Sequence, residues 1–218
     1  MNVSTTIPVP TGRSDDPGMI PSTSLPRPGA VVATGLWFFM GVATMLFGLL
    51  SLAYVFRLDG VEGYPLALPW QLWLSTGLLA IGSIALQRAS GAARLTRRSR
   101  ALGLLLFGGA CTFLFLGVQL WAWSDMQAAR VMLAGNPAGS FFYLLTAMHG
   151  LHVAGGIVAV VLTMRTVWSE SDLAREAWRI SLCARYWHFL WVVWAVLFAM
   201  MALLTPEAVR IICGTLKP

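Results

Sequence analysis

Three histidines lie within apolar segments, and they are the residues of this chain best suited to chemistry. His149 and His152 are spaced three apart in the run FFYLLTAMHGLHVAGG, and His188 lies in the later run YWHFLWVVW, one turn after Arg185. Residues three apart share one face of a helix, so two imidazoles on one helix and a third on a neighbour could bind a metal ion or a haem. Such sites normally also recruit carboxylate or cysteine ligands, or keep a position open for water.

Carboxylates are missing from the apolar segments that hold these histidines. All nine lie outside the apolar cores: Asp15, Asp16, Asp59, Glu62, Asp125, Glu170, Asp172, Glu176 and Glu207. We therefore interpret the histidines as groups that form hydrogen bonds between helices, or that contact lipid headgroups or a partner subunit. The prediction is a chain with no catalytic residue, no metal ion and no cofactor of its own. Proton pumps usually place Asp, Glu or Lys within their spans, so the sequence also disfavours a pump.

The composition excludes an ordinary soluble domain. Hydrophobic residues make up 57% of the 218 residues, charged residues make up 11%, and the mean hydropathy is +0.72. Soluble domains average about 25% charged residues. The net charge of +6 could suggest nucleic acid as a partner. We instead assign the basic residues to loops that set membrane topology, and we predict no nucleic-acid partner.

Five apolar segments predict an all-α integral membrane protein, a bundle of five transmembrane helices. They cover residues 30–56, 70–86, 101–123, 141–164 and 182–204. Segments of this length match a hydrocarbon core of about 30 Å. Because lipid cannot satisfy backbone polar groups, each segment must be a helix. The Pro-rich residues 1–29 are predicted to form a flexible tail, and residues 206–218 a short segment at the other end of the chain.

The distribution of basic residues predicts the orientation. Eleven Arg residues fall in the tail, in the connection after the second segment, and between the fourth and fifth segments, whereas four Lys or Arg residues fall on the other side. Cytoplasmic loops carry the excess of basic residues. We therefore expect the N-terminal tail to be cytoplasmic and residues 206–218 to be external.

Small and aromatic residues in the spans have a packing interpretation. Glycines allow helices to approach closely in a membrane, and five of them are candidate packing positions: Gly41, Gly48, Gly150, Gly155 and Gly156. Trp187, Trp191 and Trp194 form a stripe on the fifth segment. We interpret this stripe as packing or lipid contact rather than as a cofactor site.

The two histidine-bearing runs together resemble subunit III of haem-copper respiratory oxidases. With GLWFFMGVATMLFGLLSLAYVFR at 35–57, they are similar to the five-helix bacterial form of the cytochrome c oxidase subunit III family, over about residues 30–205. The resemblance implies a non-catalytic subunit in a bacterial plasma membrane, in direct contact with subunit I and assembled with subunit II. It implies that haems and copper lie in those partners, that phospholipid is bound, and that cytochrome c or a quinol is the electron donor. The family's motif residues fall on His149, His152, Arg185, Trp187 and His188.

Two departures from the family pattern mark a divergent branch. Many relatives carry a Ser-Glu pair in the first helix where this chain has Val42 and Ala43, and an Asp two residues after the YWHF element where it has Trp191. The roles of those carboxylates therefore do not carry over. Two alternatives stay open at this point: an accessory subunit of a nitric oxide reductase, and a small membrane transporter or channel, which nothing in the spans favours.

Overall fold

Five long helices make up the structure, a computed structural model that describes residues 28–58, 69–128, 137–169 and 173–203. The helices are α1 (Pro28–Leu58), α2 (Gln71–Arg94), α3 (Arg98–Ala128), α4 (Pro137–Ser169) and α5 (Leu173–Leu203). No strand occurs in these described ranges. The prediction of an all-α, five-helix membrane fold is confirmed. The predicted tail at 1–29 and the segment at 206–218 lie outside the described residues, apart from the first two positions of α1.

Four of the helices are long and apolar enough to cross a membrane unaided, at Gly29–Phe56, Arg98–Ala128, Gly139–Ser169 and Glu176–Leu203. The helix α2 is less apolar because it carries several Ser, Thr and Gln side chains. It nevertheless buries twelve residues, packed mainly against α3 and α5. The polar side chains lie largely on this buried face, whereas the exposed face of α2 carries the large apolar residues Trp73, Leu74, Ile81 and Ile84.

Most helices extend past the apolar segments that predict them. The fifth helix begins at Leu173 rather than 182, and α2 continues to Arg94 rather than ending at 86. The added turns of α2 bury Ala89, Ala92 and Ala93 against the rest of the bundle. Alanine is the best helix former, so these turns persist where the apolar run has ended.

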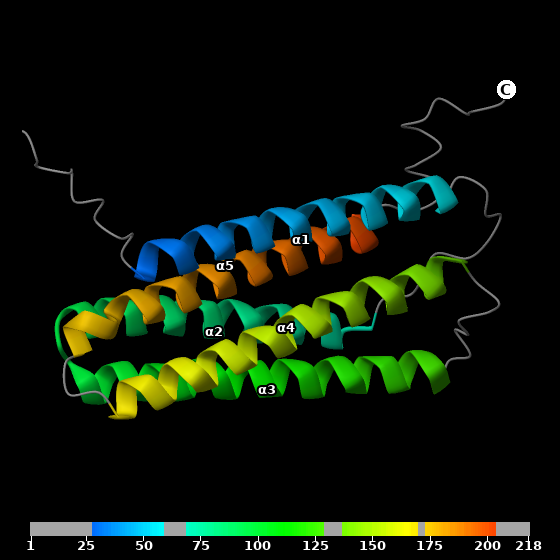
Figure 1. The fold of residues 1–218 in the computed structure, drawn as a ribbon. Helices are drawn as coiled ribbons and strands as arrows, with labels where there is room; N and C mark the ends of the chain where they lie inside the picture. Colours follow the sequence, from blue (N-terminus) through cyan, green and yellow to red (C-terminus); the bar gives the residue numbers. More distant parts are fainter. Residues whose placement is uncertain (1–27, 59–68, 129–136, 170–172, 204–218) are drawn as a thin grey trace, which may run out of the picture.

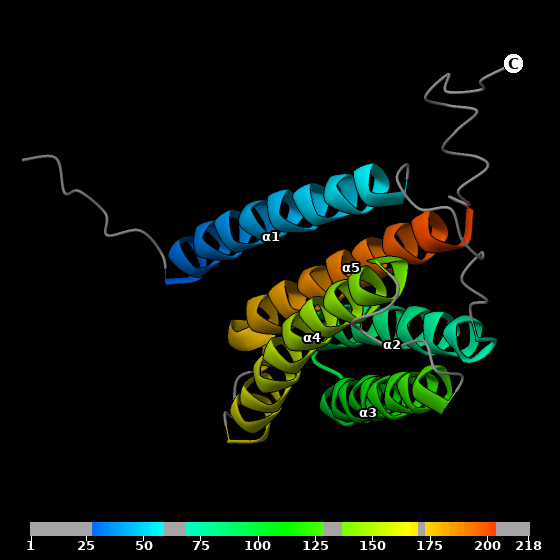
Figure 2. The ribbon, with the colours of Figure 1, turned by 90° about the vertical axis from the view of Figure 1, so that its right-hand side faces the viewer.

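The helix α5 runs through the middle of the bundle and contacts α1, α2 and α4 (Figures 1 and 2). The helix α3 completes the bundle by packing on α2 and α4. The helix α1 lies at the edge, against α5 and α4, and buries three of its described side chains: Ala43, Phe47 and Tyr54. Its remaining surface is therefore left to lipid or to another chain.

A tight turn joins α2 to α3 and sets them side by side. Thr96 adopts the left-handed conformation with φ 56°, and the backbone N–H groups of Thr96 and Arg97 donate to the carbonyls of Ala93 and Ala92. This pattern is a common way to end a helix. Farther along, a Cβ at Gly108 would lie 2.9 Å from Leu86 Cγ. Glycine at position 108 therefore allows the two helices to approach closely.

Candidate functional site

His149 lies in the centre of the bundle, fully buried among aromatic rings from three other helices. Its ring centroid is 5.1 Å from that of Trp194, 5.9 Å from Phe115 and 6.2 Å from Phe47. Neither ring nitrogen has a hydrogen-bond partner among the described residues. The imidazole is thus held by packing alone.

His152 lies one turn farther along α4, at the contact with α1 and α5. Its Nδ1 is 2.8 Å from the carbonyl oxygen of Met148 in its own helix. The hydroxyl of Tyr186 on α5 donates to the backbone carbonyl of His152 at 2.9 Å. The ring also lies near Phe39 and Phe47 of α1, with centroids 5.7 and 5.2 Å away. This histidine therefore joins three helices.

His188 faces outward from α5, on the side where α2 lies. Its Nδ1 is 2.9 Å from the hydroxyl of Ser83 on α2, and its ring lies 5.8 Å from that of Trp191. The three histidines thus occupy three different surroundings. Within the described ranges, no group of three His, Cys, Asp or Glu side chains is placed to hold a metal ion.

Hydrogen bonds between polar side chains tie the helices together inside the bundle. Gln71 of α2 donates to the carboxylate of Asp125 on α3. The remaining bonds join Trp194 Nε1 to Thr76 Oγ1 at 2.9 Å, Trp123 Nε1 to Thr146 Oγ1 at 3.1 Å, and the hydroxyls of Ser90 and Ser181 at 2.8 Å. Of these residues, only Asp125 and Trp194 stood out in the sequence, and neither was predicted to form these hydrogen bonds. Their signal was the presence of Gln, Ser and Thr inside apolar runs, where interhelical hydrogen bonds are common.

The five candidate packing glycines fall into two groups. A Cβ at Gly156 would lie 3.0 Å from the ring of Trp187 and 3.1 Å from that of Tyr186, so this residue permits the close contact of α4 with α5. At the other four positions a Cβ would meet nothing within 4 Å in the described part of the chain: Gly41, Gly48, Gly150 and Gly155. A packing role for those four stays a prediction about neighbouring molecules.

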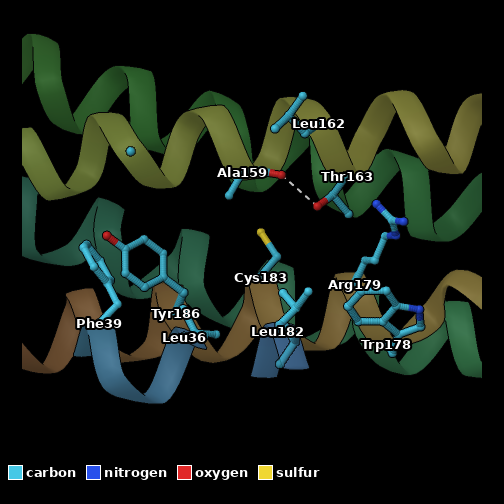
Figure 3. Close-up of a pocket in the computed structure, with 12 residues that line it drawn as sticks. Leu36, Phe39, Ala159, Leu162, Thr163, Trp178, Arg179, Leu182, Cys183 and Tyr186 are labelled. Atoms are coloured by element: carbon cyan, nitrogen blue, oxygen red, sulfur yellow. Dashed lines mark hydrogen bonds between the residues drawn. The ribbon is translucent and has the colours of Figure 1, made fainter. Parts of the chain in front are cut away.

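A largely apolar groove of about 490 Å³ opens between α1, α4 and α5 (Figure 3). Leu36 and Phe39 of α1 line it together with Leu162 of α4. At Gly155, also in the lining, a Cβ would meet no described atom within 4 Å. The hydroxyl of Thr163 is engaged by the carbonyl of Ala159, 2.7 Å away, and so adds little polarity. We call this cavity the apolar groove.

One end of the apolar groove carries charge. Arg179 lines it there beside Trp178, whose ring centroid is 5.0 Å from the Arg179 guanidinium carbon. Arg179 also forms an ion pair with Glu176 one turn earlier. The apolar groove therefore has an ion pair at one end and largely apolar side chains along the rest of its length.

A second groove, between α1 and α2 with α5 as its floor, is lined by more charged and amide side chains. It consists of two adjoining hollows of about 350 and 540 Å³, and Arg185 lines both. Arg94 and Ser181 line the smaller hollow. We call the other one, farther along α5, the deeper hollow; Gln87 and His188 line it together with four apolar residues, Trp37, Met40, Phe189 and Val192. We call these two hollows together the polar groove.

The fold and these grooves define an all-helical integral membrane protein whose polar residues tie helices together and face grooves open to the surroundings. The sequence of this chain matches the family described as cytochrome c oxidase subunit III over residues 34–205. The chain therefore belongs to that family.

Relatives in bacteria cover most of the chain. It is 25% identical over 185 residues to cytochrome bo(3) ubiquinol oxidase subunit 3 of Pseudomonas aeruginosa, covering 81% of this chain and 86% of that protein. It is 32% identical over 189 residues to probable cytochrome c oxidase subunit 3 of Nocardia farcinica, covering 81% and 89%. A third relative, probable quinol oxidase subunit 3 of Staphylococcus epidermidis, is 29% identical over 181 residues, covering 78% and 87%.

Proposed function

We propose that this chain stabilises the catalytic subunit of a terminal haem-copper oxidase and holds phospholipid beside it. Membership of the subunit III family makes the chain part of an oxidase complex. In this proposal it directly contacts subunit I, assembles with subunit II, and resides in a bacterial plasma membrane. The haems and copper belong to the partners, and cytochrome c or a quinol supplies the electrons.

The apolar groove is the observation that supports the lipid-holding role. The groove has a volume of about 490 Å³ and largely apolar walls, and Arg179, which is ion-paired with Glu176, lies at one end where a lipid headgroup would contact it. Gly155 and Ala159 are small, so the α4 side of the groove leaves room for hydrocarbon chains. A bound lipid would fill the space between α1 and α4 and so hold α1, the least buried helix, in place.

Filling the groove tests this role. We expect Gly155→Leu to lower the phospholipid retained by the purified complex, because the new side chain occupies the acyl-chain space. The activity of the complex should then decay at least twofold faster during turnover. Gly103→Leu is the matched control, since Gly103 is exposed on α3 and a Cβ there meets nothing within 4 Å among the described residues.

Native purification tests the assignment itself. The wild-type chain, isolated in mild detergent, should bring with it a larger subunit that shows haem absorbance and consumes oxygen with reduced cytochrome c or a quinol. Lipid mass spectrometry of the same sample measures the retained phospholipid. A chain that purifies free of any haem-bearing partner would contradict the proposed function.

A further inference from the structure

The polar groove places hydrogen-bonding and charged groups where lipid would otherwise contact the protein. Gln87, Arg185 and His188 are all exposed, and each lines the deeper hollow. The described part of the chain offers no hydrogen bond or ion pair to Arg185 or Gln87, and it engages only one nitrogen of His188. Three polar side chains thus present unmet groups on the outer surface of a membrane protein.

The depth of these residues makes that exposure costly. Glu176 and Arg179 form an ion pair in the first turn of Glu176–Leu203, the part of α5 that is long and apolar enough to cross a membrane. At a rise of about 1.5 Å per residue, Arg185 lies about 14 Å from Glu176 along the helix and His188 about 18 Å. The hydrocarbon core is about 30 Å thick, so His188 lies near its middle. Ionisable residues at such depths almost always face protein or water rather than lipid.

We propose that the polar groove is the seat of a transmembrane helix from a partner subunit, and that this helix carries an Asp or Glu level with Arg185 and a hydrogen-bonding side chain level with His188. The inference rests on the proposed function only in identifying the partner as another subunit of the oxidase. A carboxylate at Arg185 forms a charge-assisted pair, which a planar guanidinium makes with two parallel hydrogen bonds. Because Arg185 lines both hollows, the polar groove continues on either side of this residue and has room for a helix.

A lipid molecule would pair with fewer of the polar side chains in this groove than a helix would. A phosphate at the end of the groove could reach Arg94 and Ser181, which already bond each other at 3.2 Å. The acyl chains of that lipid would then lie against Gln87 and His188 and leave their polar atoms unmet, at a cost of a few kcal/mol. In the apolar groove, on the other side of the contact between α1 and α5, the charged residue Arg179 lies at one end, and the hydroxyls of Thr163 and Tyr186 are bonded to backbone carbonyls, so the rest of that groove suits acyl chains (Figure 3).

A second copy of this chain also fits poorly. It would need a carboxylate level with Arg185, and the described residues place none there. Asp125 lies near the opposite end of the bundle and accepts a hydrogen bond from Gln71, and Glu176 is paired with Arg179. Among the described residues, this chain therefore offers no carboxylate that would complement Arg185 in a second copy.

Photo-crosslinking in the intact complex tests the location. A benzoylphenylalanine at Val192, which lines the deeper hollow, should capture a peptide from a transmembrane helix that contains Asp or Glu, identified by mass spectrometry. The matched control is Phe113, exposed on the outer face of α3, where the same probe should capture lipid. Capture of phospholipid alone, or of a second copy, at Val192 would overturn the proposal.

Removal of the charge tests the chemistry. Arg185→Leu should lower recovery of the partner with this chain at least tenfold, while the isolated chain keeps its helix content, because Arg185 is exposed and unpaired within the bundle. Arg185→Lys should recover part of the partner, and Arg165→Leu, on an exposed site of α4, should have no effect. Undiminished recovery with Arg185→Leu would overturn the proposal.

The outcomes separate this inference from the proposed function. If a haem-bearing subunit co-purifies and crosslinks elsewhere on the chain but not at Val192, the subunit III role stands and the polar groove proposal falls. If Val192 captures an acidic transmembrane helix from a protein without haem, the groove proposal stands and the oxidase role falls.

Discussion

At the scale of single residues, His149 is a fully buried imidazole with no hydrogen-bond partner among the described residues. A buried polar group without a partner costs about 1–3 kcal/mol, and both ring nitrogens of His149 lack a partner in the described part of the chain. Packing against Phe115 and Trp194 compensates through the area that the imidazole buries. His149 thus behaves as a small aromatic residue in this fold.

This view of His149 predicts the effect of replacing it. We expect His149→Leu to leave the free energy of unfolding of the isolated chain unchanged or to raise it by about 1 kcal/mol, because an apolar side chain removes the unmet polar atoms. The haem spectrum of the complex should be unchanged. Circular dichroism during heating in detergent measures the first quantity, and a loss of more than about 1 kcal/mol would indicate that the imidazole has a partner such as water.

Some properties of these histidines and glycines could be predicted from the sequence alone, and others could not. The motif pair that contains His149 and His188 was enough to indicate the family, and the apolar runs were enough to place five helices. The different surroundings of the three histidines could not be predicted, because they depend on the orientation of α4 and α5 about their own axes. The same rotation turns Gly156 toward α5 and leaves the adjacent Gly155 to line the apolar groove.

At the scale of the helices, close contacts at glycine determine how the bundle packs. Gly108 allows α3 to approach α2, and Gly156 allows α4 to approach α5. Lipid is as apolar as the helix surfaces, so burial from water drives association little and tight packing must contribute instead. Interhelical bonds such as the one from Trp194 to Thr76 then hold the rotational setting.

Gly156→Ala measures this contribution. A methyl group at position 156 would lie 3.0–3.3 Å from Trp187, Tyr186 and Leu190, so the two aromatic rings must shift. We expect a loss of about 1–3 kcal/mol, typical of overpacking in a dense interior. Gly150→Ala on the same helix is the control, since its methyl group meets nothing within 4 Å among described residues and alanine favours a helix. Equal unfolding temperatures for the two variants would contradict the packing role of Gly156.

At the scale of the whole molecule, charge is concentrated at one end of the bundle. The arginine side chains that the structure describes all belong to the half formed by the end of α2, the start of α3, the end of α4 and the start of α5: Arg88, Arg94, Arg97, Arg98, Arg100, Arg165, Arg179 and Arg185. The first residues of α1 lie at the same end (Figure 1). Basic residues collect on the cytoplasmic side of a membrane protein, so this arrangement supports a cytoplasmic location for that end.

Two serines at opposite ends of α3 test the orientation in living cells. Ser99 and Ser124 are both exposed and lie about 37 Å apart along the helix, so their cysteine variants sample the two sides of the membrane. Cys111 and Cys183 are buried, and Cys213 is first replaced by serine. We expect a membrane-impermeant maleimide to label Ser124→Cys in intact cells and Ser99→Cys only after the membrane is opened. The reverse pattern would show that the arginine-rich end is external.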